Sequence, residues 1–150
     1  MTTDEVQQYL YDHIPLSKAM QVSAIALSDS EVILSAPLAP NINHRDTVFG
    51  GSASALAILA AWSLLYLRLR NAGVESRIVI QRNTMDYQLP MDGEFFARSS
   101  LAHPEEWDRF MRLLTSKGRA RISVSSTTEF EGKVTGQLVG EFVALGSGRP

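Results

Sequence analysis

The chain has 150 residues, the usual size of one domain, and folding at this length buries roughly 70% of the surface of the unfolded chain. Its composition, 45% hydrophobic and 20% charged, is that of a folded domain and excludes a disordered chain. The lack of cysteine excludes disulfides, thiolate nucleophiles, iron–sulfur clusters and zinc fingers, and the net charge of −2 gives no general attraction to nucleic acid or anionic membranes.

The first fifteen residues, 1–15, are predicted to form a helix. Thr2 and Glu5 have the spacing of a capping box, apolar residues recur every four positions, and Pro15 stops the helix. This segment has neither the basic stretch nor the apolar run of a signal peptide, so we expect a cytoplasmic protein. Two strands, at 20–27 and 32–38, and an irregular polar segment, at 39–48, follow.

A helix that is apolar on all sides comes next. From Ala53 to Leu67 only two serines are polar, and the cations Arg68 and Arg70 followed by Gly73 are typical of a helix end. Fifteen residues reach about 22 Å, which is short of the ~30 Å apolar layer of a membrane. We therefore expect a buried core helix and no membrane span.

The second half of the chain returns to the two-residue period of strands. We expect a short amphipathic helix at 104–114, a frayed tail at 147–150, and strands at 76–89, 94–101, 118–131 and 133–145. The order of elements fits one α+β domain, 1–150, in which a single antiparallel sheet wraps around the apolar helix. Because one sheet cannot cover that helix on all sides, we also expect self-association.

The polar loop 41–52 leads directly into the apolar helix and is the candidate site. The first turn of a helix leaves about four N–H groups without partners inside the helix, and the helix dipole adds positive potential there. Gly50 and Gly51 let a ligand approach these amides, while Asn43 and His44 add side-chain donors. In the alternative interpretation the glycines only permit a tight entry and Ser52 caps the helix. The sequence leaves both interpretations open.

Other patterns that could carry chemistry are weaker. The three histidines have no close pairing, so no metal site is predicted, and neither a glycine-rich phosphate loop nor a nucleophile elbow is present. Asn83 and Asp86, on the long strand, face either a site or solvent at an exposed strand edge. A run of five cations without an acid indicates either a solvated face or a docking patch for an acidic partner or a phosphate: Arg109, Arg112, Lys117, Arg119 and Arg121.

These features together resemble a known family. The order of elements, with a histidine and paired glycines at the start of the buried helix, is similar to the hotdog fold of acyl-thioester enzymes. More narrowly, the segment 41–52, Asn-Ile-Asn-His-Arg-Asp-Thr-Val-Phe-Gly-Gly-Ser, followed by Ala55-Leu56-Ala57 and Trp62, resembles the YiiD C-terminal domain family of thioesterases. The resemblance covers nearly all of residues 16–146.

The resemblance implies two alternative reactions. Hotdog thioesterases of the phenylacetyl-CoA type carry an acidic residue at the position of Ile58, and this helix has no Asp or Glu between Ser52 and Ala72. Relatives of the stand-alone MadB type are associated instead with decarboxylation of malonyl-acyl carrier protein to acetyl-acyl carrier protein, which supports initiation of fatty-acid synthesis. That reaction needs an oxyanion hole and no base, so it is the first expectation. An acyl-CoA or acyl-carrier-protein thioesterase is the alternative, and a non-catalytic acyl-binding module is the third.

The same resemblance implies roles for the site residues. Asn43 and His44 would act on the thioester and the enolate, and the amides of Gly51 and Ser52 would complete the oxyanion hole. Substrate binding is expected from the rest of the loop and from the long strand of a partner chain: Asn41, Asp46, Thr47, Val48, Phe49, Gly50, Asn83 and Asp86. The five cations would dock an acidic carrier protein. The expected assembly is a homodimer or a dimer of dimers, with no cofactor and no metal.

Overall fold

The computed structural model describes residues 1–146, and the tail predicted at 147–150 lies outside the described residues. The elements follow the predicted order, although their bounds differ by a few residues. In chain order they are α1 (Thr3–His13), α2 (Pro15–Ala19), β1 (Ser23–Leu27), β2 (Val32–Ala36), η1 (Ala39–Asn41), α3 (Gly50–Asn71), β3 (Ser76–Tyr87), β4 (Phe95–Leu101), η2 (Pro104–Glu106), α4 (Trp107–Lys117), β5 (Arg119–Phe130) and β6 (Lys133–Gly146).

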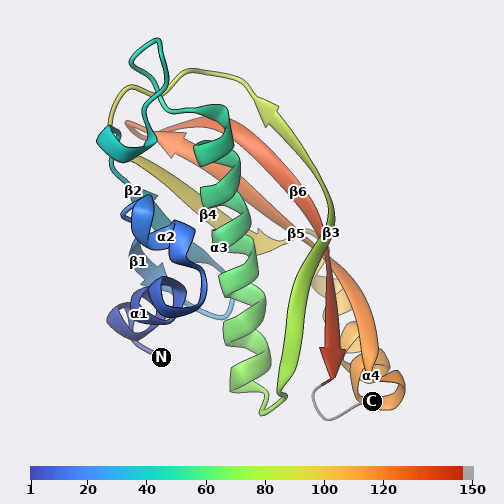
Figure 1. Cartoon of the computed structure of the whole chain (residues 1–150). Helices are drawn as coiled ribbons and strands as arrows, with labels where there is room; N and C mark the ends of the chain where they lie inside the picture. Colours follow the sequence, from blue (N-terminus) through green and yellow to red (C-terminus); the bar gives the residue numbers. More distant parts are fainter. Residues whose placement is uncertain (147–150) are drawn as a thin grey trace.

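The six strands form one antiparallel sheet in the order β1-β2-β4-β5-β6-β3. Figure 1 shows this sheet curving around α3, with α1 and α2 beside the helix and α4 near the end of the sheet where α3 finishes. The predicted α+β hotdog architecture is therefore confirmed. β1 and β3 are the edge strands, and β3 is long and largely exposed.

Small side chains allow α3 to lie close to the sheet. Ala57 and Ala60 are fully buried, and their carbonyl oxygens accept hydrogen bonds from the hydroxyls of Ser126 and Ser99, each at 2.8 Å. A larger residue at either alanine would separate the helix from the serine. The core thus combines apolar packing with two hydrogen bonds that satisfy buried hydroxyls.

The apolar helix is longer than the sequence predicts. It begins at Gly50 and ends at Asn71, so its 22 residues reach about 33 Å. By length and composition α3 could cross a membrane, which contradicts the length argument made from residues 53–67 alone. The fold nevertheless buries 61% of the most apolar stretch of α3, so α3 is the core helix of a soluble domain. The exclusion of a membrane span rests on burial rather than on length.

Three predicted helix boundaries are confirmed and one is shifted. Thr2 and Glu5 form the expected capping box, and Gly73 has the left-handed φ of +72°. Pro15 ends α1 as predicted but also begins the short helix α2, because proline is well suited to the first position of a helix. The helix predicted at 104–114 is a 3-10 turn followed by α4, which extends to Lys117.

Helix α4 is held against the end of α3. The guanidinium of Arg68 lies 4.1 Å from the centre of the Trp107 ring, and Phe110 is buried in the core. Burial of Arg68 lowers the pKa of its guanidinium, although nearby Asp29 opposes that shift. α4 therefore lies far from Gly50, at the opposite end of the core helix.

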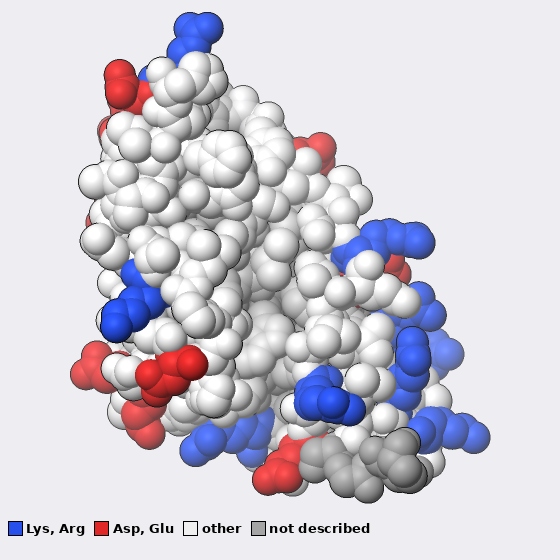
Figure 2. Space-filling view, viewed as in Figure 1, with Lys and Arg blue, Asp and Glu red and all other residues white. Residues whose placement is uncertain are grey.

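One side of α3 is left partly uncovered beside the edge strand β3. Ile58 and Trp62 of α3 and Ile80 of β3 line a wholly apolar hollow of about 280 Å³. Figure 2 shows the same region as an uncharged, hollowed band down the middle of the face. The sheet therefore leaves part of the helix unburied, as the sequence predicts.

Candidate functional site

The start of α3 lacks a side-chain cap. The residue at the cap position is Phe49, whose extended backbone (φ −60°, ψ 134°) brings no hydroxyl, carboxylate or amide to the first turn. Its carbonyl oxygen accepts the N–H groups of Ser52 and Ala53 at 2.9 and 3.0 Å. Within residues 1–146 no acceptor is bonded to the N–H groups of Gly50 and Gly51. The two open donors are thus one position earlier than the expected pair, Gly51 and Ser52.

Ser52 does not cap α3. Because α3 starts at Gly50, Ser52 is the third helical residue, and its side chain makes no capping hydrogen bond. The alternative interpretation in which Ser52 caps the helix is therefore wrong. Two glycines with open amides leave the first turn without the stabilisation that a cap would provide.

Two aromatic rings flank the glycine pair. A Cβ at Gly51 would lie 2.4 Å from Cε2 of Phe49, so this position requires glycine unless the ring moves. The ring itself is 57% exposed. On the other side, the hydroxyl of Tyr87 donates to the carbonyl oxygen of Gly50 at 3.2 Å. The rings thus border the open amides with apolar surface.

A hollow of about 370 Å³ adjoins the start of α3. Val48 and Gly50, two of the predicted binding residues, are among its lining residues, together with Tyr87 and Met91. Two threonines contribute the buried hydroxyls, and Thr135 Oγ1 lies 3.0 Å from both Met91 Sδ and Thr128 Oγ1. No Asp, Glu, His, Lys or Arg of residues 1–146 lines this hollow. Its chemistry is that of backbone amides and neutral groups.

Asn43 organises the loop that precedes α3. Its Oδ1 accepts the N–H groups of Arg45 and Thr47 at 2.8 and 3.1 Å, and its Nδ2 donates to Thr47 Oγ1 at 2.9 Å. Asp46 in this turn has a left-handed φ of +63°. The Val48 N–H donates to the carbonyl oxygen of Met91 at 2.8 Å. Asn43 therefore gives the loop its shape, and its side-chain amide forms hydrogen bonds within the loop itself.

Asn41 and His44 occupy opposite environments. The Asn41 side chain is 2% exposed and its Nδ2 donates to the carbonyl oxygens of Met20 and Pro37, at 3.0 and 2.8 Å. Its own carbonyl accepts the Phe49 N–H, which ties the loop to the helix start. His44 is exposed and does not line the hollow. Asn41 is thus an anchor of the loop, and His44 lies on its surface.

The structure separates Asp86 from the hollow. Tyr87 points toward α3, as its bond to Gly50 shows, so by the alternation of a strand Asn83 shares that face and Asp86 lies on the opposite one. Both side chains are exposed. A copy of β3 added at the sheet edge would keep the same faces. Asp86 is therefore unsuited to supply a carboxylate to the site.

The predicted cation run divides into two parts. Arg109, Lys117, Arg119 and Arg121 line one groove between α4 and the sheet, whereas Arg112 is not among its lining residues. This groove belongs to the end of the molecule opposite Gly50. The five cations are close in the sequence, but the sequence does not show which of them share one surface. That depends on which face of α4 is buried.

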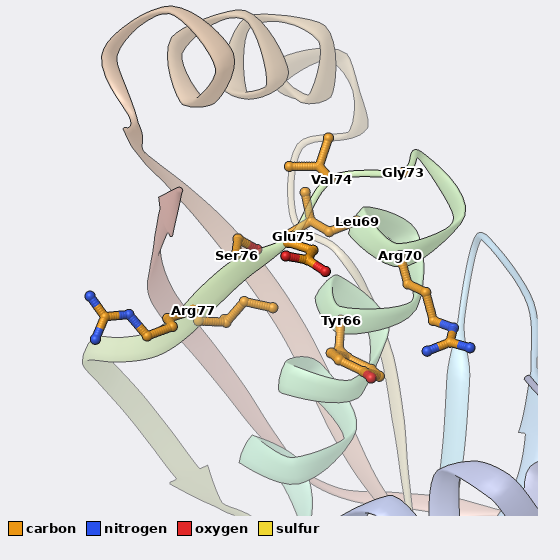
Figure 3. A pocket seen from close by; sticks show the side chains of 9 residues that line it. Tyr66, Leu69, Arg70, Gly73, Val74, Glu75, Ser76 and Arg77 are labelled. Atoms are coloured by element: carbon orange, nitrogen blue, oxygen red, sulfur yellow. The ribbon is translucent and has the colours of Figure 1, made fainter. Parts of the chain in front are cut away.

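A hollow of about 540 Å³ lies at the other end of α3, and the sequence did not indicate it. Figure 3 shows the side chains of Arg70 and Arg77 pointing away from one another, with the carboxylate of Glu75 and the ring of Tyr66 between them. Diverging cations around a carboxylate do not converge on an anion. This hollow is accordingly a weaker candidate than the start of α3.

The site residues that sequence reasoning missed are Tyr87, Met91, Thr128 and Thr135. They meet because β3 pairs with β6, placing Tyr87 opposite Gly136, and because β5 pairs with β6 next to it. No local pattern marks these residues. The Pro-Met-Asp-Gly sequence after β3 is typical of a turn and gives no sign of a pocket.

Known proteins resemble this chain over nearly its whole length. It matches the family described as "Putative thioesterase (yiiD_Cterm)" over residues 3–146. A protein of unknown function from Chlorobaculum tepidum is 28% identical, with a TM-score of 0.90 over 97% of this chain and 94% of that one. A "putative thioesterase" from Shewanella oneidensis is 25% identical, with a TM-score of 0.84 over 95% and 96%. A thioesterase from Haemophilus influenzae, 12% identical with a TM-score of 0.76 over 99% and 94%, shares the fold.

Proposed function

Because the chain belongs to the YiiD_C family of thioesterase-like hotdog proteins, we propose that it binds an acyl thioester at the start of α3 and hydrolyses it. The observation that carries the proposal is the pair of open amides of Gly50 and Gly51 beside an apolar hollow. A thioester carbonyl oxygen bonded to these amides gains stabilisation as it becomes an oxyanion. The hollow accepts the carbon chain next to it.

Hydrolysis then proceeds by attack of water on the thioester carbon. The carbonyl π electrons move to the oxygen held by Gly50 and Gly51, the C–S bond breaks as the carbonyl reforms, and the thiol leaves with a proton. The attacking water must lose a proton to a base. The hollow supplies none, so we assign this role to His44 or Asp46, which lie on the adjoining loop.

A second reaction is favoured by the lack of acidic groups around the hollow. Decarboxylation of malonyl-acyl carrier protein breaks the bond between the carboxylate and C2, and the electron pair forms a thioester enolate held by the same two amides. A proton then added at C2, for which His44 is the candidate donor, gives acetyl-acyl carrier protein. The reaction needs no base, and the apolar lining disfavours a solvated carboxylate relative to CO₂. It would support initiation of fatty-acid synthesis.

The proposed active form is a homodimer. β3 is an unpaired edge strand, and the apolar hollow lined by Ile58, Trp62 and Ile80 runs beside it. Two-fold pairing of β3 with its own copy would be antiparallel, would extend the sheet and would cover this hollow. Sedimentation should give twice the mass of one chain, and Ile80→Asp, which places a carboxylate on the covered face, should shift the protein to monomers. A monomeric parent protein would refute the dimer.

Mass spectrometry of thioesters incubated with the purified protein tests the function. Release of free thiol and free acid from acyl-CoA or acyl carrier protein would identify hydrolysis. A shift from malonyl to acetyl on the carrier protein would identify decarboxylation instead. If no thioester of either kind is altered while the acyl group still binds, the chain is an acyl-binding module and both reactions are refuted.

A further inference from the structure

A basic groove lies between α4 and the start of β5. Arg109 and Lys117 line it from α4, and Arg119 and Arg121 line it from β5. Its volume is about 590 Å³, and Leu113, Ala120 and Val143 contribute apolar lining. We refer to these four cations and the apolar residues between them as the α4 groove. It combines a basic rim with an apolar floor.

The charges of the four cations in the α4 groove are not neutralised by carboxylates in the part of the chain that the structure describes. Within residues 1–146 none of them forms an ion pair. Arg98, at the middle of the sheet, is different: its guanidinium lies 3.0 Å from both Glu31 and Glu129, and those hydrogen bonds raise its pKa. One carboxylate, that of Glu106, lines the groove against four positive charges. The groove therefore has unused positive charge to offer a ligand.

Sheet register extends the positive surface beyond the groove. Arg119 of β5 and Arg77 of β3 both pair with Leu145 of β6, so the two arginines share a face of the sheet about 10 Å apart. Arg82 continues the row along β3, 3.9 Å from Glu141. Figure 2 shows Lys and Arg side chains gathered along the right and lower right of the molecule, where β3 and the ends of β5 and β6 lie.

We propose that the α4 groove docks an acidic carrier protein that presents the thioester. This proposal rests on the proposed function, since it names the carrier of the same substrate. A single phosphate would need donors that converge on one point, whereas Arg109 and Lys117 lie eight residues, or about 12 Å, apart along α4 and the groove has an apolar floor. Spread cations around an apolar strip fit a protein surface with several carboxylates and exposed apolar side chains.

The docking surface and the thioester site work together across the dimer. The α4 groove lies at the end of α3 about 33 Å from Gly50 by helix length. Antiparallel pairing of β3 with its copy brings the groove end of one subunit toward the Gly50 end of the other. The carrier would thus bind one subunit and deliver its thioester to the second.

Steady-state kinetics with one acyl group on two carriers tests the docking surface. The parent protein is compared with Arg119→Glu and Arg121→Glu, using the carrier-protein thioester and the matching pantetheine thioester. Lys18→Glu, on α2, is the matched control because it makes the same change in charge outside the groove. At low salt, each groove variant should raise KM for the carrier-protein thioester about tenfold and leave kinetics with the pantetheine thioester unchanged. Lys18→Glu should change neither.

Direct binding of the unloaded carrier protein provides the second readout. Its affinity for the parent protein should fall with added salt and with either groove variant. Binding of the carrier without turnover of any thioester would refute the proposed function and keep the docking surface. If the protein turns over the pantetheine thioester, and the parent and the groove variants have equal KM values for the carrier-protein thioester, the docking surface alone is refuted. An effect on the CoA thioester as large as on the carrier thioester, or displacement by short RNA, would also overturn it.

Discussion

Helices α1 and α3 begin in opposite ways. At α1, Thr2 Oγ1 accepts the Glu5 N–H at 3.1 Å, and Glu5 Oε1 accepts the Thr2 N–H at 3.0 Å. At α3, no side chain of residues 1–146 takes this role and the N–H groups of Gly50 and Gly51 stay open. The chain therefore caps α1 with side chains but leaves the start of α3, beside the hollow, without a side-chain cap.

The difference is possible because the two helices draw their stability from different sources. α1 is 11 residues long and buries only Val6 and Leu10 completely within one face, so its cap contributes a large share. α3 buries eleven of its residues in the core of the sheet. Burial on that scale holds the helix without help from its first turn, which leaves the amides available for a ligand.

Adding a cap to α3 should have the largest effect on activity. In Phe49→Asp the new carboxylate would accept an N–H of the first turn and place a negative charge where the oxyanion forms. We expect activity on pantetheine thioesters to fall by more than about 10³-fold and the free energy of unfolding to rise by about 1 kcal/mol. Enzyme assays and thermal unfolding measure the two effects. Phe49→Ala, which removes the ring without adding a cap, separates loss of the ring from capping.

Removing the backbone N–H donor of Gly50 should have the next largest effect. Proline is favoured at the first helical position, which Gly50 occupies, and the extended backbone of Phe49 is compatible with a following proline. Gly50→Pro should therefore keep or raise the melting temperature and lower kcat about 10²- to 10³-fold. Unchanged kcat in a folded Gly50→Pro protein would remove Gly50 from the oxyanion hole and leave Gly51.

Loop shape can be tested apart from the helix. Asn43→Asp keeps the two acceptor bonds to Arg45 and Thr47 but loses the amide donor to Thr47 Oγ1, while Asn43→Ala loses all of them. We expect Asn43→Ala to destabilise the fold by about 1–3 kcal/mol and Asn43→Asp by less. If Asn43 also contacts the substrate, Asn43→Asp should reduce activity as strongly as Asn43→Ala. His44→Ala is the companion variant, and full activity in all three would remove both residues from the mechanism.

Much of the fold could be predicted from the sequence because its signals are local. The all-apolar run from Ala53 and the strict alternation in β5 identify a core helix and a half-buried strand. The start of α3 was placed three residues late because Gly50 and Gly51 are poor helix formers. Tertiary burial of the following turns overrides that preference, and no local pattern records it.

The candidate site could be predicted only in part. The loop and the glycine pair are contiguous, so their place at the helix start follows from the sequence alone. The face of the sheet on which Asp86 lies could not be predicted, because the face of a strand residue depends on register and the bulge between Ile80 and Arg82 changes the alternation along β3. Tyr87 and Thr135 come together only through strand pairing.

The smallest effect on activity is expected at the capped helix. Thr2→Ala should cost about 1 kcal/mol of stability and leave activity on pantetheine thioesters unchanged, because α1 lies apart from the hollow. Hydrogen bonds from Thr2 lower the pKa of Glu5 below its ordinary value of 4.5. The carboxylate half of the cap, the bond from the Thr2 N–H to Glu5 Oε1, is therefore fully present above pH 4.5 and is lost as the pH falls through the lowered pKa of Glu5. Unfolding measured against pH should show parent and Glu5→Ala converging in acid, and a constant difference between them would mean that the Glu5 carboxylate takes no part in the cap.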